Sequence, residues 1–382
     1  PYGGCTATDT AVVSFIPCIL PYYPPPDSGK VSNIIGAELL SLYLHYGQVT
    51  DSATTIFRLA SDSVLIDVVA LQGQYNTLLS LLQTAPYGIT NLIDNGPNSL
   101  IITGKYPIVN LKKLDSLGNL INFCRPAFPA ISNAGITSTG GDAAMHTDLV
   151  RNGYQLSGAG IKIGVLSDSY NTLPGNPAQI NVLNGDLPGT GNPDNPNPVQ
   201  VLREYPYGIG SDEGRAMLQI VHDIAPKASL AFRTGFITPG DFANGILQLQ
   251  QAGCKVMVDD VTFITEPFFS DGIVAKTIDQ VAAQGVAYFT SAGNFGRASY
   301  ESDFNGIPAP NGIVGYAHDF GNGDLFQNVS LKPGTYTIVL QWEDSVYSLN
   351  SSPAGTQNDL DIYLTDNQGQ TLFGFNRNNI GG

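Results

Sequence analysis

The pattern of apolar and polar positions divides the chain into three stretches with different periodicities. Between residues 158 and 294, apolar runs of strand length alternate with runs of helical spacing. This alternation is typical of an α/β fold, in which helices cover both faces of a parallel sheet. The expected strands are 161–169, 228–235, 254–263 and 286–294, and the expected helices are 213–224, 240–253 and 271–285. We therefore expect an α/β domain over residues 158–308.

An earlier stretch, residues 61–128, carries the order strand, helix, strand, helix, which predicts a small α+β domain of the split βαβ kind. The expected strands are 63–72 and 99–107, and the expected helices are 75–86 and 111–123. Residues 129–157 resemble a linker that runs into a short helix. Residues 1–60 form an N-terminal extension to which the pattern assigns no role.

The last stretch, residues 309–382, alternates apolar and polar residues with a period of two and contains turn signals. The clearest segments are 334–344 and 358–376. They predict an all-β segment, a β-sandwich or jelly roll. A sandwich needs more strands than this stretch supplies, so we expect the domain to continue beyond residue 382.

Composition and charge narrow the class of protein. The 382 residues include 43 glycines and 25 prolines, only 13% are charged, and the net charge is −15. This composition favours a loop-rich protein that is secreted or exposed at the cell surface. The acidic balance argues against a nucleic-acid partner, and no apolar run is long enough for a membrane span. Cys5 and Cys18 are spaced so that they could close a small disulfide loop, whereas Cys254 is expected to be a free buried thiol.

Polar residues end several of the expected parallel strands, where functional groups of α/β sheets gather. Asp168 ends the first strand, the pair Asp259 and Asp260 ends the third, and Asn294 ends the last. Asp168 is either a functional carboxylate or a cap for the following turn. Asn294 either donates its side-chain amide to a developing oxyanion or belongs to an ordinary turn. Glu213 lies in the first turn of a helix, where acidic residues are also favoured by the helix dipole.

Three motifs resemble the peptidases of the subtilisin and sedolisin group: GAGIKIGVLSDSYN (158–171), EGRAMLQIVHDIAPKASL (213–230) and YFTSAGNFG (288–296). The resemblance implies a subtilisin-like sheet and a serine endopeptidase acting on protein or peptide substrates. Asp168 falls at the catalytic aspartate and Asn294 at the oxyanion-hole asparagine. Residues 61–128 resemble, in architecture, the propeptide that chaperones and inhibits many subtilisins. The chain's own propeptide-like domain would then be a partner of the catalytic domain.

Two departures from the family pattern bear on activity. Glu213 stands where subtilisins have their catalytic histidine, as in sedolisins, yet Met217 stands where sedolisins carry an aspartate. A glutamate beside a carboxylate can share a proton and act as a general base at acidic pH. No Gly-Thr-Ser nucleophile motif occurs in the 382 residues, so we expect the serine beyond residue 382. The alternative is an inactive pseudoprotease that serves as an extracellular scaffold or adhesive protein.

No cofactor is expected. Two acidic, glycine- or asparagine-rich segments, 183–199 and 359–368, could hold a structural calcium ion, but neither has the ligand spacing of a calcium loop, which favours solvated surface loops.

Overall fold

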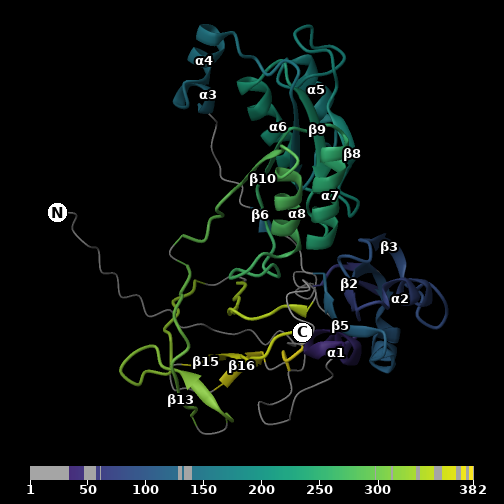
Figure 1. Ribbon diagram of the computed structural model, residues 1–382, viewed down its shortest axis with the longest axis vertical. Helices are drawn as coiled ribbons and strands as arrows, with labels where there is room; N and C mark the ends of the chain where they lie inside the picture. The colour runs from purple at the N-terminus through teal and green to yellow at the C-terminus, as the bar shows by residue number, and fades with distance from the viewer. Residues whose placement is uncertain are drawn as a thin grey trace.

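Two five-stranded sheets organise the chain (Figure 1). The computed structural model describes residues 34–46, 57–60, 62–127, 131–132, 140–296, 298–310, 313–332, 336–347, 355–366, 371–375 and 378–381. The first sheet belongs to an α+β domain and the second to an α/β domain. The expected disulfide loop of Cys5 and Cys18 lies outside the described residues.

The α+β domain is an antiparallel sheet with helices packed on it. Its strands are β1 (Leu59–Ala60), β2 (Ser63–Ala70), β3 (Thr90–Asp94), β4 (Ile101–Pro107) and β5 (Ile121–Pro126). The sheet order is β3–β4–β2–β5, with β1 also paired to β2. The helical elements are α1 (Gly36–His45), α2 (Tyr75–Leu82) and the 3₁₀ helix η2 (Ile108–Leu117). This is the split βαβ arrangement that the sequence predicts, and α1 adds Leu39 and Leu42 to the same core.

Two of the predicted helices in this domain differ from the observed ones. The helix expected over 75–86 ends at Leu82, and the helix expected over 111–123 is a 3₁₀ helix that ends at Leu117. In η2, four buried residues recur at a spacing of three, which matches the three residues per turn of a 3₁₀ helix. They are Ile108, Leu111, Leu114 and Leu117. Residues 121–123 belong to β5 instead.

The α/β domain contains a fully parallel sheet, as the sequence predicts. Its strands are β7 (Lys162–Ser167), β8 (Gln200–Arg203), β9 (Ser229–Thr234), β10 (Val256–Asp259) and β12 (Ala287–Thr290). Their order across the sheet is β12–β10–β7–β9–β8, and each neighbouring pair is parallel. All carboxyl ends therefore lie at one edge of the sheet.

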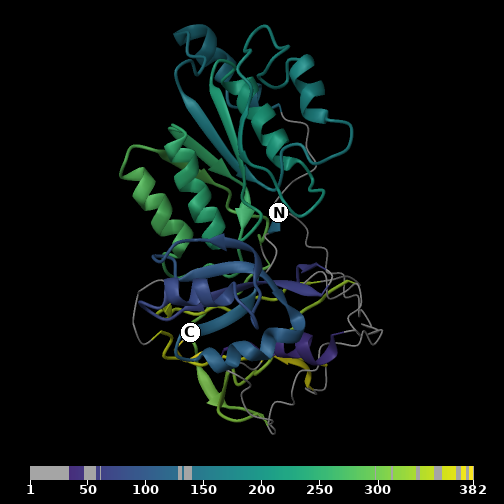
Figure 2. The same ribbon diagram turned by 90° about the vertical axis from the view of Figure 1, so that its right-hand side faces the viewer.

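Helices cover both faces of this sheet, which confirms the predicted α/β class (Figure 2). One face packs against α5 (Pro177–Leu183) and α6 (Glu213–Ile224), through a core that includes Val165 and Phe232. The opposite face packs against α7 (Pro239–Gln251) and α8 (Ile273–Ala282), through a core that includes Leu166 and Ala231. The alternation along β7 and β9 thus divides the apolar residues between two helix layers.

The connection from β8 through α6 to β9 has an unusual hand. The chain moves from β7 past β9 to β8 with α5 on one face, and then returns from β8 to β9 with α6 on that same face. The next two connections continue in the returning direction with α7 and α8 on the other face. The β8–α6–β9 crossover is therefore opposite in hand to the other three. Because right-handed crossovers are nearly universal, we assign it as left-handed.

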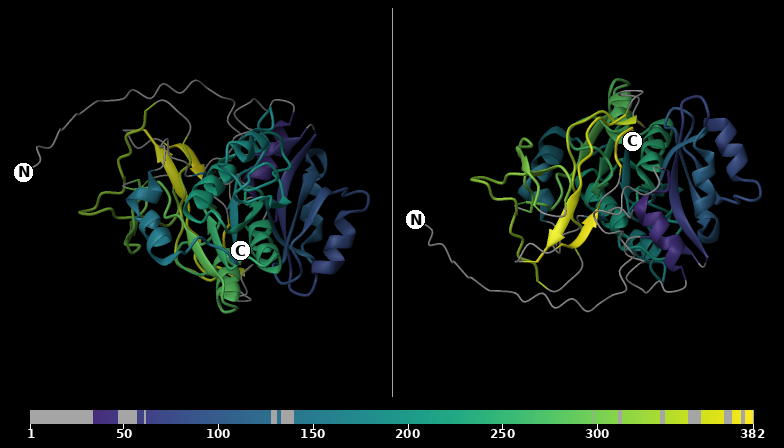
Figure 3. Two further views of the ribbon diagram at one scale, coloured as in Figure 1. Left: turned by 90° about the horizontal axis from the view of Figure 1, so that it is seen from above. Right: turned by 90° about the horizontal axis from the view of Figure 1, so that it is seen from below.

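The remaining elements are short. They are α3 (Gly141–Ala144), α4 (Thr147–Tyr154), β6 (Ile131–Ser132), β11 (Val261–Thr262), β13 (Gly306–Pro308), β14 (Tyr316–His318), β15 (Ile362–Thr365) and β16 (Thr371–Phe375). Two separate hairpins, β13–β14 and β15–β16, are the strands described beyond residue 300. Figure 1 shows β15–β16 below the α/β domain, at the level of the α+β domain, and Figure 3 shows the same hairpin from above and below. The jelly-roll or sandwich over 309–382 stays a prediction.

The α+β domain contacts the α/β domain near the carboxyl ends of the parallel strands. The Arg58 guanidinium donates hydrogen bonds to the carbonyl oxygens of Ile237 (2.8 Å) and Phe236 (2.7 Å), which follow β9. Arg58 and Lys105 also lie over the ring of Tyr207, at 5.9 and 5.4 Å from its centroid. Within the described part of the chain, no helix is both long and apolar enough to cross a membrane.

Candidate functional site at the carboxyl edge of the parallel sheet

Asp168 directly follows β7 and is only 5% exposed. Its Oδ1 accepts hydrogen bonds from the main-chain N–H groups of Glu213 (3.0 Å) and Ser169. Its Oδ2 accepts from the Ser211 hydroxyl (2.7 Å) and the Ser211 N–H. A buried carboxylate requires such partners, and here they join the end of β7 to the start of α6. Asp168 therefore caps the neighbouring helix as well as its own turn.

Glu213 is the first residue of α6 and is half-buried. Its Oε2 accepts a hydrogen bond from the Ser167 hydroxyl at 3.2 Å. The structure thus brings Glu213 and Asp168 together, through the N–H group of Glu213, although 45 positions separate them in the sequence. The partial positive charge at the start of α6 also stabilises a carboxylate at this position.

A third carboxylate, Asp212, joins the same two loops, because it lies at the start of α6 and accepts hydrogen bonds from the loop after β7. It precedes α6 in the left-handed region (φ 56°) and is 2% exposed. Its Oδ1 accepts from the Thr172 N–H (2.7 Å), the Thr172 hydroxyl (2.8 Å) and the Ser169 hydroxyl (3.0 Å), and its Oδ2 pairs with Arg215. Burial on its own raises the pKa of Asp212, but these hydrogen bonds outweigh it and lower the pKa to about 2.

Glu204 holds the next part of the loop that follows β7. Its two carboxylate oxygens accept hydrogen bonds from the N–H groups of Tyr170 and Asn171, both at 2.9 Å. The Tyr170 carbonyl in turn accepts from Arg215 at 2.9 Å. Carboxylates in each of the loops after β7 and before α6 therefore bind the other loop, and these hydrogen bonds hold the site in one geometry.

Asp259 and Asn294 lie after the neighbouring strands. Asp259 ends β10 and is 4% exposed, and its Oδ1 accepts from the Thr290 hydroxyl (2.9 Å) and the Val261 N–H (3.1 Å). Burial raises the pKa of Asp259. Asn294 follows β12 and is exposed. The parallel register of β10 and β12 puts both residues at the same edge of the sheet as Asp168.

A piece of the predicted linker also lies at this edge. β6 (Ile131–Ser132) pairs antiparallel with β11, which begins one residue after Asp260. An extended peptide recognised through main-chain hydrogen bonds adds to a strand in the same way. Ile131 and Ser132, in the predicted linker, therefore pair as a short strand beside the carboxyl ends of the sheet.

The histidine on α6 is not part of this cluster. His222 is 4% exposed, and its Nε2 lies 3.3 Å from the Asn192 Nδ2 in the loop between α5 and β8. Burial lowers the pKa of His222. Among the described residues, no group of three or more His, Cys, Asp and Glu side chains is placed to hold a metal ion. Cys254 is a free buried thiol, as predicted, and burial raises its pKa to about 11.

Two site residues were missed by sequence reasoning, Asp212 and Glu204. Asp212 stands next to Glu213 at the start of a helix, a position that favours capping residues, so a signal was present. No local signal marks Glu204, because its partners are main-chain N–H groups about thirty positions away.

No model of a known protein family matches the chain, and no curated protein matches its sequence. Solved structures match it in part. The epidermin leader peptide processing serine protease (EpiP) from Staphylococcus aureus shares 13% identity with a TM-score of 0.37, covering 64% of this chain and 65% of that one. Fervidolysin from Fervidobacterium pennivorans, a keratinolytic enzyme related to subtilisin, shares 15% identity with a TM-score of 0.33, covering 62% and 41%. The chain spans less than two thirds of either structure, so its function has to follow from its own residues.

Proposed function

We propose that the chain is part of a secreted serine endopeptidase in which Glu213 is the general base. One observation carries the proposal: the end of β7 and the start of α6 meet through Asp168 and Glu213, beside a linker strand seated on β11. The three sequence motifs of the subtilisin and sedolisin group add support. The α+β domain acts as the propeptide, and β6 is a substrate-like strand.

The reaction follows from acyl-transfer chemistry. A serine hydroxyl beyond residue 382 attacks the peptide carbonyl, its proton passes to the Glu213 carboxylate, and the proton then moves to the leaving amine. Water hydrolyses the acyl-enzyme in the reverse sequence of proton transfers. Asp168 fixes the first turn of α6 and so positions Glu213, while the Asn294 amide donates to the oxyanion.

The test is proteolysis by the full natural protein on an unfolded protein substrate, between acidic and neutral pH. Glu213→Gln keeps the shape of the side chain but removes the base, so we expect activity to fall by about 10²-fold or more. Glu301→Gln, at an exposed glutamate beyond β12, is the matched control and is expected to leave activity unchanged. Equal activity of Glu213→Gln and wild type would remove Glu213 from the mechanism.

The alternative is a pseudoprotease that acts as an extracellular scaffold. It is favoured by the full set of hydrogen bonds on Asp168, because those contacts explain this buried carboxylate without catalysis. The intact mass of the natural protein discriminates between the two. A mass matching 40.5 kDa, together with absence of proteolysis, would overturn the endopeptidase and favour the scaffold.

A further inference from the structure

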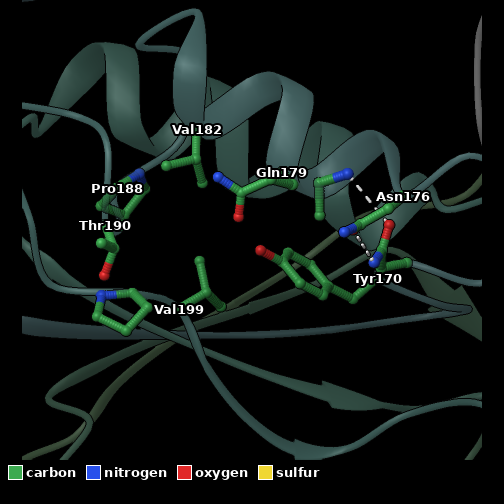
Figure 4. A pocket seen from close by; sticks show the side chains of 11 residues that line it. Tyr170, Asn176, Gln179, Val182, Pro188, Thr190 and Val199 are labelled. Carbon is green, nitrogen blue, oxygen red and sulfur yellow. Dashed lines mark hydrogen bonds between the residues drawn. The ribbon is translucent and has the colours of Figure 1, made fainter.

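A pocket of about 250 Å³ lies between α5, the loop after β7 and the loop before β8 (Figure 4). It is separate from the carboxylate cluster around Asp168. Its lining residues are Tyr170, Asn171, Asn176, Ala178, Gln179, Val182, Pro188, Gly189, Thr190, Pro198 and Val199. Pockets for drug-sized ligands are usually larger, roughly 300–1,000 Å³. This one has room for a single six-membered ring with its substituents.

The lining contains no charged side chain. A charged ligand would lose water here without gaining a counter-ion, which is unfavourable. The polar groups are instead hydroxyls and carboxamides. In the described structure, the Tyr170 hydroxyl, the Gln179 carboxamide and the Thr190 hydroxyl have no hydrogen-bond partner within the protein. A wholly apolar ligand would leave these groups dehydrated and unpaired.

The geometry favours a ligand with polar groups around its rim and an apolar face. In Figure 4 the Tyr170 hydroxyl and the Gln179 side chain extend into the pocket from different walls, and Thr190 lies at the far end. Val182 and Val199 supply apolar surface between them. A pyranose ring has this character, since its hydroxyls point outward and its C–H groups form an apolar face.

The pocket is also preformed. The main chain of Tyr170 is held by Glu204 and Arg215, and its ring packs against Phe232 with the centroids 5.8 Å apart. At the rim, the Asn171 Nδ2 donates to the Asn176 Oδ1 at 2.8 Å, and the Asn171 Oδ1 accepts from the Ala178 N–H at 3.1 Å. Rigid walls lower the ordering cost of binding. We propose that this pocket binds one neutral sugar residue, either free or at the end of a glycan.

The test is ligand-observed NMR and calorimetry on the full chain with N-acetylglucosamine, glucose and mannose. Glucosamine and glucuronate are the cationic and anionic counterparts. We expect saturable binding of at least one neutral sugar and weaker binding of both charged ones. Tyr170→Phe and Gln179→Ala each remove one hydrogen-bonding group and are expected to weaken binding roughly three- to tenfold. The methyl glycoside of the best ligand distinguishes the sources, because only a glycan-end site tolerates the added methyl group.

The matched control is Gln280→Ala, at an exposed glutamine of α8 on the other face of the sheet, which is expected to leave binding unchanged. Tyr170→Phe keeps the ring against Phe232, and Gln179 is exposed, so both variants are expected to fold. Absence of saturable binding by every neutral sugar would overturn the proposal. So would binding that Tyr170→Phe and Gln179→Ala leave unchanged, or a preference for a charged ligand.

Discussion

Asp168 and Asp212 bind each other's loops reciprocally. Asp168 lies after β7 and accepts hydrogen bonds from the loop that leads into α6, whereas Asp212 lies at that helix start and accepts from the loop after β7. Both carboxylates are buried, and N–H and O–H groups replace the water that each would otherwise bind. The ionised carboxylate of Asp212 therefore stabilises the folded arrangement of the two loops.

This coupling predicts a pH dependence for Asp212→Asn. The pKa of Asp212 is lowered from 3.8 to about 2 in the folded chain. A lowered pKa contributes stability above the unfolded value of 3.8, and this contribution is lost as the pH falls through about 2. We expect the variant to lose on the order of 2 kcal/mol of unfolding free energy at pH 7, measured by urea denaturation.

The difference between wild type and variant should shrink as the pH falls from 4 towards 2, since the wild-type carboxylate then becomes protonated. Asp279→Asn, at an exposed aspartate of α8, is the control and is expected to change stability little. A variant difference that stays constant from pH 7 to pH 2 would contradict the assignment of Asp212.

At the scale of elements, the placement of α6 decides where Glu213 lies. The helix approaches β9 and the loop after β7 closely at Gly214, which is buried. A Cβ atom at this position would overlap the Phe232 ring and would lie 2.8 Å from the carbonyl oxygen of Ser169. Glycine is thus required so that the first turn of α6 can dock beside Asp168.

Gly214→Ala is therefore expected to destabilise the fold by about 1–3 kcal/mol, because the added methyl group overpacks the contact with β9. Thermal unfolding followed by circular dichroism measures this. Gly153→Ala on α4 is the matched control, since a Cβ there meets nothing within 4 Å and alanine favours a helix. Equal melting temperatures of Gly214→Ala and wild type would show that α6 docks differently.

Some helices and strands of the α/β domain could be predicted from the apolar pattern of the sequence, and others could not. The strands β7, β9, β10 and β12 were predicted because each is a run of mostly apolar residues, although β12 lies at the sheet edge and three of its four residues are exposed. β8 was missed because it is a short edge strand with half of its residues exposed, and α5 was missed because it is only seven residues long and buries just Ala178 and Val182. Spacing alone could not bring Asp168 to Glu213. Only the resemblance suggested that pairing, and the reciprocal role of Asp212 depends on loop geometry that no pattern encodes.

At the scale of the whole molecule, the α+β domain rests on the edge of the sheet that carries the candidate site. Arg58 is the main connection described there, because one guanidinium donates to two carbonyl oxygens after β9 and also covers Tyr207. Burial lowers the pKa of Arg58, as expected for a cation inside a contact between domains. Tyr207 belongs to the loop that leads to Asp212 and Glu213, so docking of the domain restrains that loop.

Arg58→Ala is consequently expected to loosen the loop over 204–212 and the segment after β9, and hydrogen–deuterium exchange measures both. Hydrogen bonds to a charged group contribute roughly 1.5–3 kcal/mol, so amides protected by docking should exchange about ten- to a hundredfold faster. Arg58→Lys keeps the charge but loses the two-pronged geometry, and an intermediate effect is expected. Lys112→Ala, at an exposed lysine of η2, is the control. Unchanged exchange in Arg58→Ala would mean that other contacts hold the two domains together, and that the α+β domain does not restrain the helix start through this arginine.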